Sequence, residues 1–224
     1  MNDPMQAYEA ALTQHRLAVG RESWITTLSS PGWQAQLLAR WLLRVTAHTV
    51  TLAEQLDHRV VGVDRQAMIG EAQAIDCWLT AHRYYHPDAT ALLAAPLLPG
   101  AREFVLLYED VAAGPHPQCH LAIRYEFGQL WLRIGPNVLQ GCDRTFGADT
   151  RCYAAIANQV DLAAERTPID GRHLAESLNE GSDTLAAMVN VGQRGLALYS
   201  AFLVECLRLA DADLDFSSSA REIV

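Results

Sequence analysis

The sequence contains no lysine, and all 17 of its basic residues are arginine. Without a lysine amine no Schiff base can form, so lysine-based covalent catalysis and pyridoxal phosphate anchoring are excluded. A Walker A loop and a protein-kinase active site each place a lysine on the nucleotide phosphates, so both are excluded too. An alanine-, arginine- and leucine-rich composition is typical of GC-rich bacterial genomes, which explains the missing lysine by mutational bias.

The sequence also lacks a signal peptide, a membrane span and the common cysteine motifs. The first residues lack the basic and apolar regions of a signal peptide, and no apolar run approaches the ~20 residues of a membrane span. The five cysteines are widely spaced, without a C-x-x-C pair, which argues against a disulfide framework and a zinc knuckle. We therefore expect a cytoplasmic protein with no membrane association.

The charge balance limits the partners. The chain carries 26 acidic residues and a net charge of -9, and its arginines are scattered rather than clustered. A protein that binds nucleic acid needs clustered cations to displace counterions from the phosphates, so no nucleic acid is expected. An acidic surface suits a basic protein partner, and a homodimer is a further option.

Three- and four-residue spacing of apolar side chains predicts helices over most of the chain. The strongest pattern covers 31–58, where Ser30 and Pro31 form a helix start. Asp64 is expected to start a helix at 64–86. The remaining expected helices cover 4–19, 88–95, 150–166, 172–179 and 183–210. The serine- and aspartate-rich end, 211–224, is expected to be a flexible acidic tail.

Between 103 and 135 the apolar spacing changes from 3.6 to 2, which predicts strands. The strands are expected at 103–111, 119–127 and 130–134, with Gly128-Gln129 as a hairpin turn and Gly135-Pro136 as the end. The predicted fold is therefore α+β and predominantly helical. It has about six helices in a single domain, 1–210, with a central three-stranded antiparallel β-meander at 103–135.

In that hairpin Arg124 would face Arg133 directly, and like charges in a cross-strand pair are destabilising. Glu126, Glu109 or a bound anion should neutralise them, and Trp131 would form an apolar wall beside them. These four residues are the predicted ligand site, for a carboxylate or phosphate. The alternative is a solvated sheet face whose arginines pair with neighbouring glutamates.

Histidine is the expected proton-transfer residue, because its pKa lies nearest neutrality, and His82 and His120 are the predicted acid/base candidates. His82 and His86 are one helical turn apart, and with His116 and His120 they could form a four-ligand metal site if the two pairs met. The pattern H-E-x-x-H is absent, so no metal site is predicted. No cofactor is identified. The alternative for His82 and His86 is a helix-terminal pair in solvent.

Nucleophilic catalysis and dinucleotide binding have little support. The patterns G-x-S-x-G and G-x-G-x-x-G are both absent. Cys142 lies next to Asp143 and close to Arg144, which could lower the pKa of its thiol, but a buried structural cysteine is the favoured interpretation.

The polar side of the 31–58 helix carries Arg40, Arg44, His48 and His58. Exposure of this side is favoured, as an ordinary solvated face. If the last helix covered it instead, these side chains would need buried partners, and a pocket between the helices would be indicated.

Two function classes remain. The first is a cytoplasmic acidic accessory protein that docks a protein partner through a helical surface. The second is a domain, binding or catalytic, for a small anionic molecule at the arginine, histidine and tryptophan site. The first is slightly favoured because no catalytic motif is present, and whether the protein is an enzyme stays open.

Overall fold

The computed structural model describes residues 3–20, 35–56, 64–179 and 182–221, and within them the protein is all-α. Eight α-helices and no strands are found in these ranges. The helices are α1 (Pro4–Gly20), α3 (Ala35–Gln55), α5 (Arg65–Ala81), α6 (Ala89–Leu93), α7 (Pro99–Ala113), α8 (His120–Phe146), α9 (Ala154–Leu178) and α10 (Ser182–Arg221). Two short 3₁₀ turns, η1 (Pro117–Cys119) and η2 (Thr150–Cys152), precede α8 and α9.

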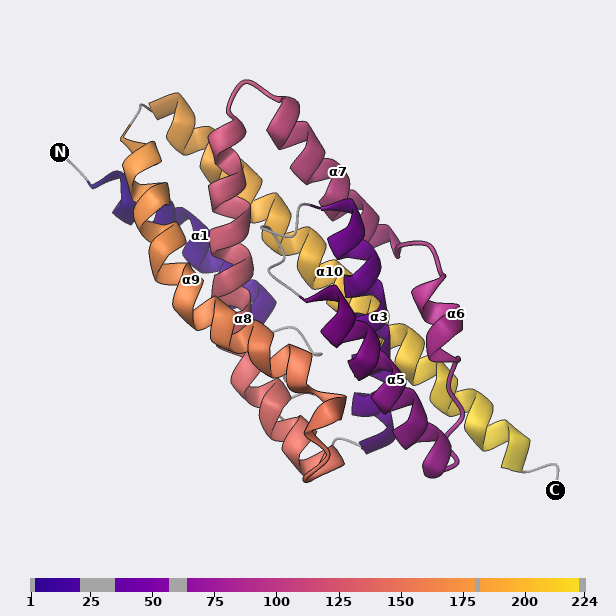
Figure 1. The fold of residues 1–224 in the computed structure, drawn as a ribbon. Helices are drawn as coiled ribbons and strands as arrows, with labels where there is room; N and C mark the ends of the chain where they lie inside the picture. Colours follow the sequence, from indigo (N-terminus) through magenta and orange to yellow (C-terminus); the bar gives the residue numbers. More distant parts are fainter. Residues whose placement is uncertain (1–2, 21–34, 57–63, 180–181, 222–224) are drawn as a thin grey trace.

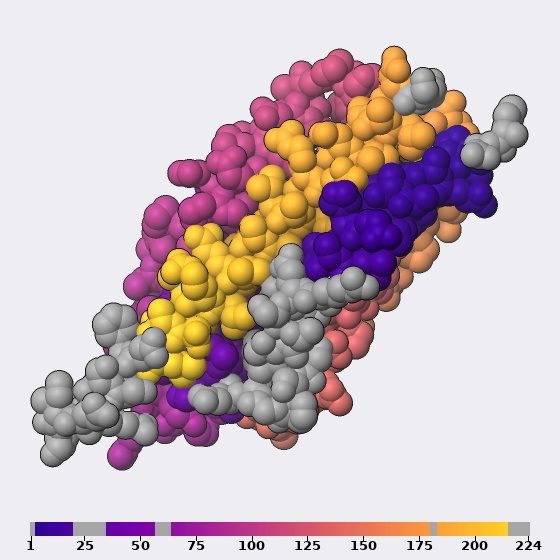
Figure 2. Space-filling model, turned by 180° about the vertical axis from the view of Figure 1, so that it is seen from behind, coloured from indigo at the N-terminus to yellow at the C-terminus, as the bar shows by residue number. Residues whose placement is uncertain are grey.

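The helices form an elongated bundle in which α10 runs along nearly the whole length (Figure 1). Helix α3 lies inside it and packs against α5, α7, α8 and α10, so that every residue from Leu38 to Val50 is buried. From the opposite side, α1 lies along α10 (Figure 2). None of the described helices is long and apolar enough to cross a lipid bilayer.

The predicted α+β class is wrong, because the segment 103–135 contains no meander. Residues 103–111 lie within α7, and the two other predicted strands and their turn lie within the single helix α8. Gly128 was predicted to lie in a hairpin turn and Gly135 to end the third strand, but both lie within α8. A Cβ at Gly128 would come within 2.1 Å of Thr167 Oγ1, and one at Gly135 within 2.5 Å of Val160 Cγ2. These glycines allow close approach of α8 and α9 rather than a reversal of the chain.

Pro136 was predicted to end the third strand and Pro168 to lie in a break between two helices, but neither proline interrupts its helix. Pro136 lies inside α8 and Pro168 lies inside α9, although 167–171 was predicted to be a break. A proline leaves one backbone carbonyl without its helical donor. Both prolines are on the exposed side of their helices, so water can satisfy that carbonyl and the helix continues.

Other predictions were confirmed locally. Asp64 caps α5 by accepting hydrogen bonds from the amides of Gln66 and Ala67. The predicted start at Ser30 and Pro31 lies outside the described residues. At the other end α10 continues to Arg221, so residues 211–221 are helical where a flexible tail was predicted.

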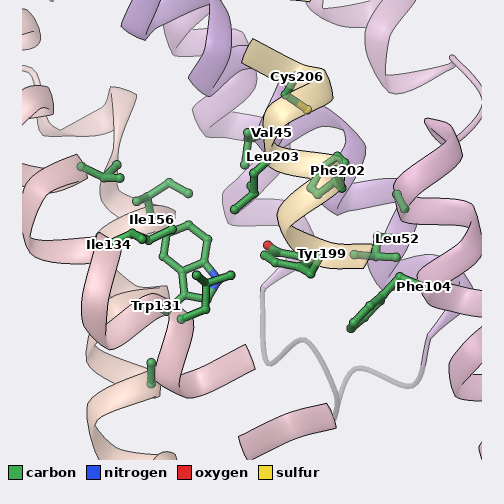
Figure 3. Close-up of a cluster of buried hydrophobic side chains, with 14 of the residues drawn as sticks. Val45, Leu52, Phe104, Trp131, Ile134, Ile156, Tyr199, Phe202, Leu203 and Cys206 are labelled. Carbon is green, nitrogen blue, oxygen red and sulfur yellow. The ribbon is translucent and has the colours of Figure 1, made fainter. Parts of the chain in front are cut away.

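The core is formed where aromatic side chains of α8 and α10 meet α3 and α7 (Figure 3). Trp131 and Tyr199 point toward each other there, and Phe202, Leu203 and Cys206 continue the buried row along α10. The indole Nε1 of Trp41 on α3 donates to the carbonyl of Leu203 at 3.1 Å. The last helix is therefore held against α3 by both apolar contact and a hydrogen bond.

Candidate functional site

The structure does not bring Arg124 and Arg133 together. They are nine residues apart on α8, which places them on opposite sides of the helix and roughly 13 Å apart along it. Arg124 donates to Asp170 of α9 at 2.5 Å, whereas Arg133 donates to the carbonyl of Arg16 on α1. The cross-strand repulsion that motivated the anion site therefore does not exist.

The other two residues of that predicted site lie inside the protein. Trp131 is 1% exposed in the core, and Glu126 is fully buried. The Glu126 carboxylate accepts two hydrogen bonds from Arg16, at 2.6 and 2.8 Å, and one from the hydroxyl of Tyr8 at 3.0 Å. Burial, followed by the negative charge of Glu126, raises the pKa of Tyr8, so the phenol keeps the proton that it donates. The cation that pairs with Glu126 is therefore Arg16, where Arg124 and Arg133 were predicted.

The end of α5, which His82 follows, and the start of α8, at His120, lie at opposite ends of the bundle (Figure 1). His82 follows α5 and stacks on Trp78 with 4.0 Å between ring centroids, and His86 bonds to Asp76 at 2.5 Å. His116 and His120 flank η1, at the start of α8. Within the described ranges, no group of three or more His, Cys, Asp and Glu side chains could hold a metal ion.

The polar side of α3 is buried, in contrast to the exposure that was favoured. Arg40 is 1% exposed, Arg44 8% and His48 2%. These three side chains, which we call the basic face, follow one another at four-residue spacing. Arg40 Nε donates to the carbonyl of Tyr85 at 2.6 Å. His58 lies outside the described residues.

A carboxylate of the last helix binds the basic face. Arg44 Nη2 donates to Asp213 Oδ2 at 2.5 Å, and the ring of His48 meets Phe202 edge to face. Asp213 also stabilises the charged form of Arg40 electrostatically. A single described carboxylate thus lies beside two guanidinium groups in a buried setting.

Two polar atoms of the basic face are buried without a hydrogen-bond partner among the described residues: Arg44 Nε and His48 Nδ1. Burial, and then the nearby charge of Arg44, lowers the pKa of His48 to about 4. The imidazole is therefore neutral at pH 7 and offers one donor and one acceptor. An orphaned buried donor costs about 1–3 kcal/mol, so a hydrogen-bond partner for these atoms would stabilise the protein.

The residue that sequence reasoning missed is Glu71 of α5. It is 2% exposed, and its carboxylate accepts from Thr46 Oγ1 at 3.1 Å and from the amides of Ala155 and Ile156 at 2.6 and 3.4 Å. A signal was present, because Glu71 falls three residues after Met68 and so lies on the apolar side of its helix. A carboxylate in that position must be buried.

Burial raises the pKa of Glu71 to about 7, while its hydrogen bonds oppose the shift. The folded protein thus binds this proton more tightly than the unfolded chain, and its contribution to stability is lost as the pH rises from about 4.5 to 7. The expected loss is roughly 3 kcal/mol. In Glu71→Gln the amide oxygen can still accept from the backbone, and its NH₂ can donate to Thr46.

Urea unfolding of the wild type and Glu71→Gln across pH 4 to 8 checks this prediction. The stability of the variant relative to the wild type should increase with pH, since the variant carries no ionising group at this position. A relative stability that does not change with pH would contradict it.

The bundle is a heme oxygenase-like helical fold. It superposes on the crystal structure of a domain of unknown function with a heme oxygenase-like fold from Shewanella denitrificans OS217, with a TM-score of 0.62 over 94% of each chain. The two sequences are 14% identical, so the likeness establishes the fold and neither a haem site nor an activity. No protein-family model matches the chain, and no curated protein matches it significantly.

Proposed function

We propose that the protein binds a small anionic molecule through the basic face of α3. The observation that carries this proposal is the pair of orphaned buried atoms, Arg44 Nε and His48 Nδ1, beside a carboxylate from α10. Arginine forms paired hydrogen bonds with carboxylate and phosphate groups, so its guanidinium suits such a ligand. The bound Asp213 side chain occupies the position that a ligand carboxylate would take.

Anion-dependent stability tests this function. Low-millimolar succinate, citrate and phosphate are added to the wild type, to Arg44→Gln and to Arg65→Gln, and urea unfolding is measured. Arg65 is an exposed arginine paired with Glu54, so its removal is the matched control. A ligand at 100 times its dissociation constant should stabilise the wild type and the control by about 2.7 kcal/mol, and Arg44→Gln by far less.

Phosphate also stabilises proteins through exclusion from their surface, and that effect is equal in all three proteins. Equal responses of the wild type and Arg44→Gln to every anion would therefore overturn the proposal.

Removal of the resident carboxylate should strengthen anion binding. In Asp213→Asn the amide competes less well for Arg44, so we expect the dissociation constant to fall roughly tenfold, which corresponds to about 1.4 kcal/mol. Isothermal titration calorimetry measures the change, with Asp211→Asn as a control on the same helix. An unchanged affinity would mean that Asp213 and the ligand do not share the site.

The alternative role, docking of a protein partner or a second copy, stays a prediction. Exposed large apolar side chains are found on several different helices, and they include Leu17, Leu106, Leu132, Ile169 and Val204. Such scattered residues are ordinary on protein surfaces, so they give this role no specific support. We expect a cytoplasmic location, since all five cysteines are free thiols in the structure.

A further inference from the structure

A groove of about 740 Å³ lies where α5 meets η2 and the beginning of α9. It is separate from the basic face, because Thr46, which bonds to Glu71 of the groove, lies on the opposite side of α3 from Arg44. The α5 wall contributes Gly70, Glu71, Cys77 and Trp78, and small alanine side chains line much of the remainder. Its volume is within the range of small-molecule sites.

Glu71, once it is ionised above its pKa of about 7, sets the charge of this groove. Asp149 and Arg151, at the rim, bind each other through two hydrogen bonds of 2.8 and 2.9 Å and so neutralise one another. Of the charged side chains in the groove wall, Glu71 is left without an opposite charge. Its hydrogen-bond donors are neutral, one hydroxyl and two amides.

The carboxylate has room for one more donor. A carboxylate offers about four acceptor positions, and Glu71 uses three, one on Oε1 and two on Oε2. A cation that bonded to the remaining position would also stabilise the ionised form, which burial disfavours. The carboxylate is therefore ready to accept a cationic donor.

The remainder of the groove suits an apolar body. Trp78 contributes an aromatic wall, held in place by its stack on His82 and by edge contact with Phe146 at 5.1 Å. At Gly70 an added Cβ would meet nothing within 4 Å, so the groove is open above that residue. An aromatic ring could lie between Gly70 and Trp78.

From this arrangement we propose that the groove binds a small protonated aromatic amine, with its ammonium group on Glu71 and its ring against Trp78. This site is independent of the proposed anion function, because it lies on another face and has the opposite charge. Amine binding in the groove and anion binding at the basic face are separate proposals, so the failure of one does not affect the other.

Alkylation of Cys77 reports on occupancy of the groove. Cys77 lines the groove and is exposed, whereas the other four cysteines are buried. Benzylamine is the probe, benzyl alcohol is its neutral control, and the rate of Cys77 modification by iodoacetamide is followed by peptide mass spectrometry. At ten times its dissociation constant benzylamine should slow this rate about tenfold, since about nine-tenths of the sites are occupied.

Three variants test whether the protection of Cys77 by benzylamine depends on binding in the groove. Glu71→Gln should lose the protection by benzylamine, because the counter-ion is gone. Gly70→Leu should lose it by filling the groove, and this surface change keeps the test valid if Glu71→Gln does not fold. Gly70→Ala leaves room for the ring, so it should keep the protection while its helix gains up to about 1 kcal/mol.

The proposal is overturned if benzylamine gives no protection at concentrations that leave the fold intact. It is also overturned if benzyl alcohol protects equally, or if Gly70→Leu is protected as the wild type is.

Discussion

Replacement of Arg16 by methionine should lower the free energy of unfolding by about 3–5 kcal/mol, because it leaves the carboxylate of Glu126 buried without its cation. Arg16 donates two hydrogen bonds to Glu126 and also pairs with Glu9. Glu126 is fully buried, so water cannot replace the lost donors. The hydroxyl of Tyr8 remains as its one described partner.

The position of this ion pair increases the expected loss. Arg16 is on α1 and Glu126 is on α8, and Tyr125 of α8 also bonds to Glu9 of α1 at 2.6 Å. Gly192 of α10 lies against the same group, since a Cβ there would be 2.5 Å from the Tyr8 hydroxyl. The packing of α1 on the bundle therefore depends on this network.

Urea unfolding measures the effect, with Arg65→Gln as the control. Arg65 pairs with Glu54 at the surface, where both side chains are about half exposed, so its loss should change stability by no more than about 0.5 kcal/mol. The double replacement Arg16→Met with Glu126→Leu should recover much of the loss, because no buried charge is left unpaired. A loss below about 1 kcal/mol for Arg16→Met would contradict a buried, coupled pair.

Truncation of Trp131 to alanine should cost a similar 3–5 kcal/mol, through the lost burial and the cavity that remains. Trp131 is 1% exposed and lies between Ile134, Ile156 and Tyr199 in the core (Figure 3). Phe127, one turn earlier on α8, makes T-shaped contacts with both Trp131 and Tyr199, at 6.5 and 4.7 Å between ring centroids. The aromatic cluster that joins α8 to α10 would lose its largest member.

Two comparisons separate a core role from a ligand role for Trp131. Trp131→Phe should recover a large part of the stability, since it keeps an aromatic ring in the cavity. Leu106→Ala on α7 removes a large apolar side chain that is 44% exposed, so it should be close to neutral. If Trp131→Ala unfolded at the same urea concentration as the wild type, the assignment of Trp131 to the core would be wrong.

The helices with one clear apolar side could be predicted from the sequence. The stripe in 31–58 and the helix start at Asp64 correctly indicate α3 and α5, because both signals depend on residues within one or two turns. The segment 119–134 could not be assigned in this way. Its apolar residues fit alternation over a short stretch, and Gly128 fits a turn, yet both patterns are also compatible with a helix that packs closely on a neighbour.

The position of the candidate site could not be predicted from the sequence. An arginine-based site for an anion was expected, but at Arg124 and Arg133, because a hairpin register would have placed them face to face. The alternative that the last helix covers Arg40 and Arg44 was recognised, and burial of the basic face confirms that alternative. Its carboxylate partner, Asp213, is 169 residues away in the chain, in a segment expected to be flexible.

The sequence by itself determined which chemistry this protein has. It has no lysine, its permanent cations are all arginine, and its apolar stripes require a helical core. Only the tertiary structure decided which polar groups are buried together. Arg16 and Glu126 are 110 residues apart, and local periodicity carries no information about such a contact. Pairing across helices is set by the packing of whole faces, and this packing placed a carboxylate, a guanidinium or a neutral imidazole where water could no longer solvate it.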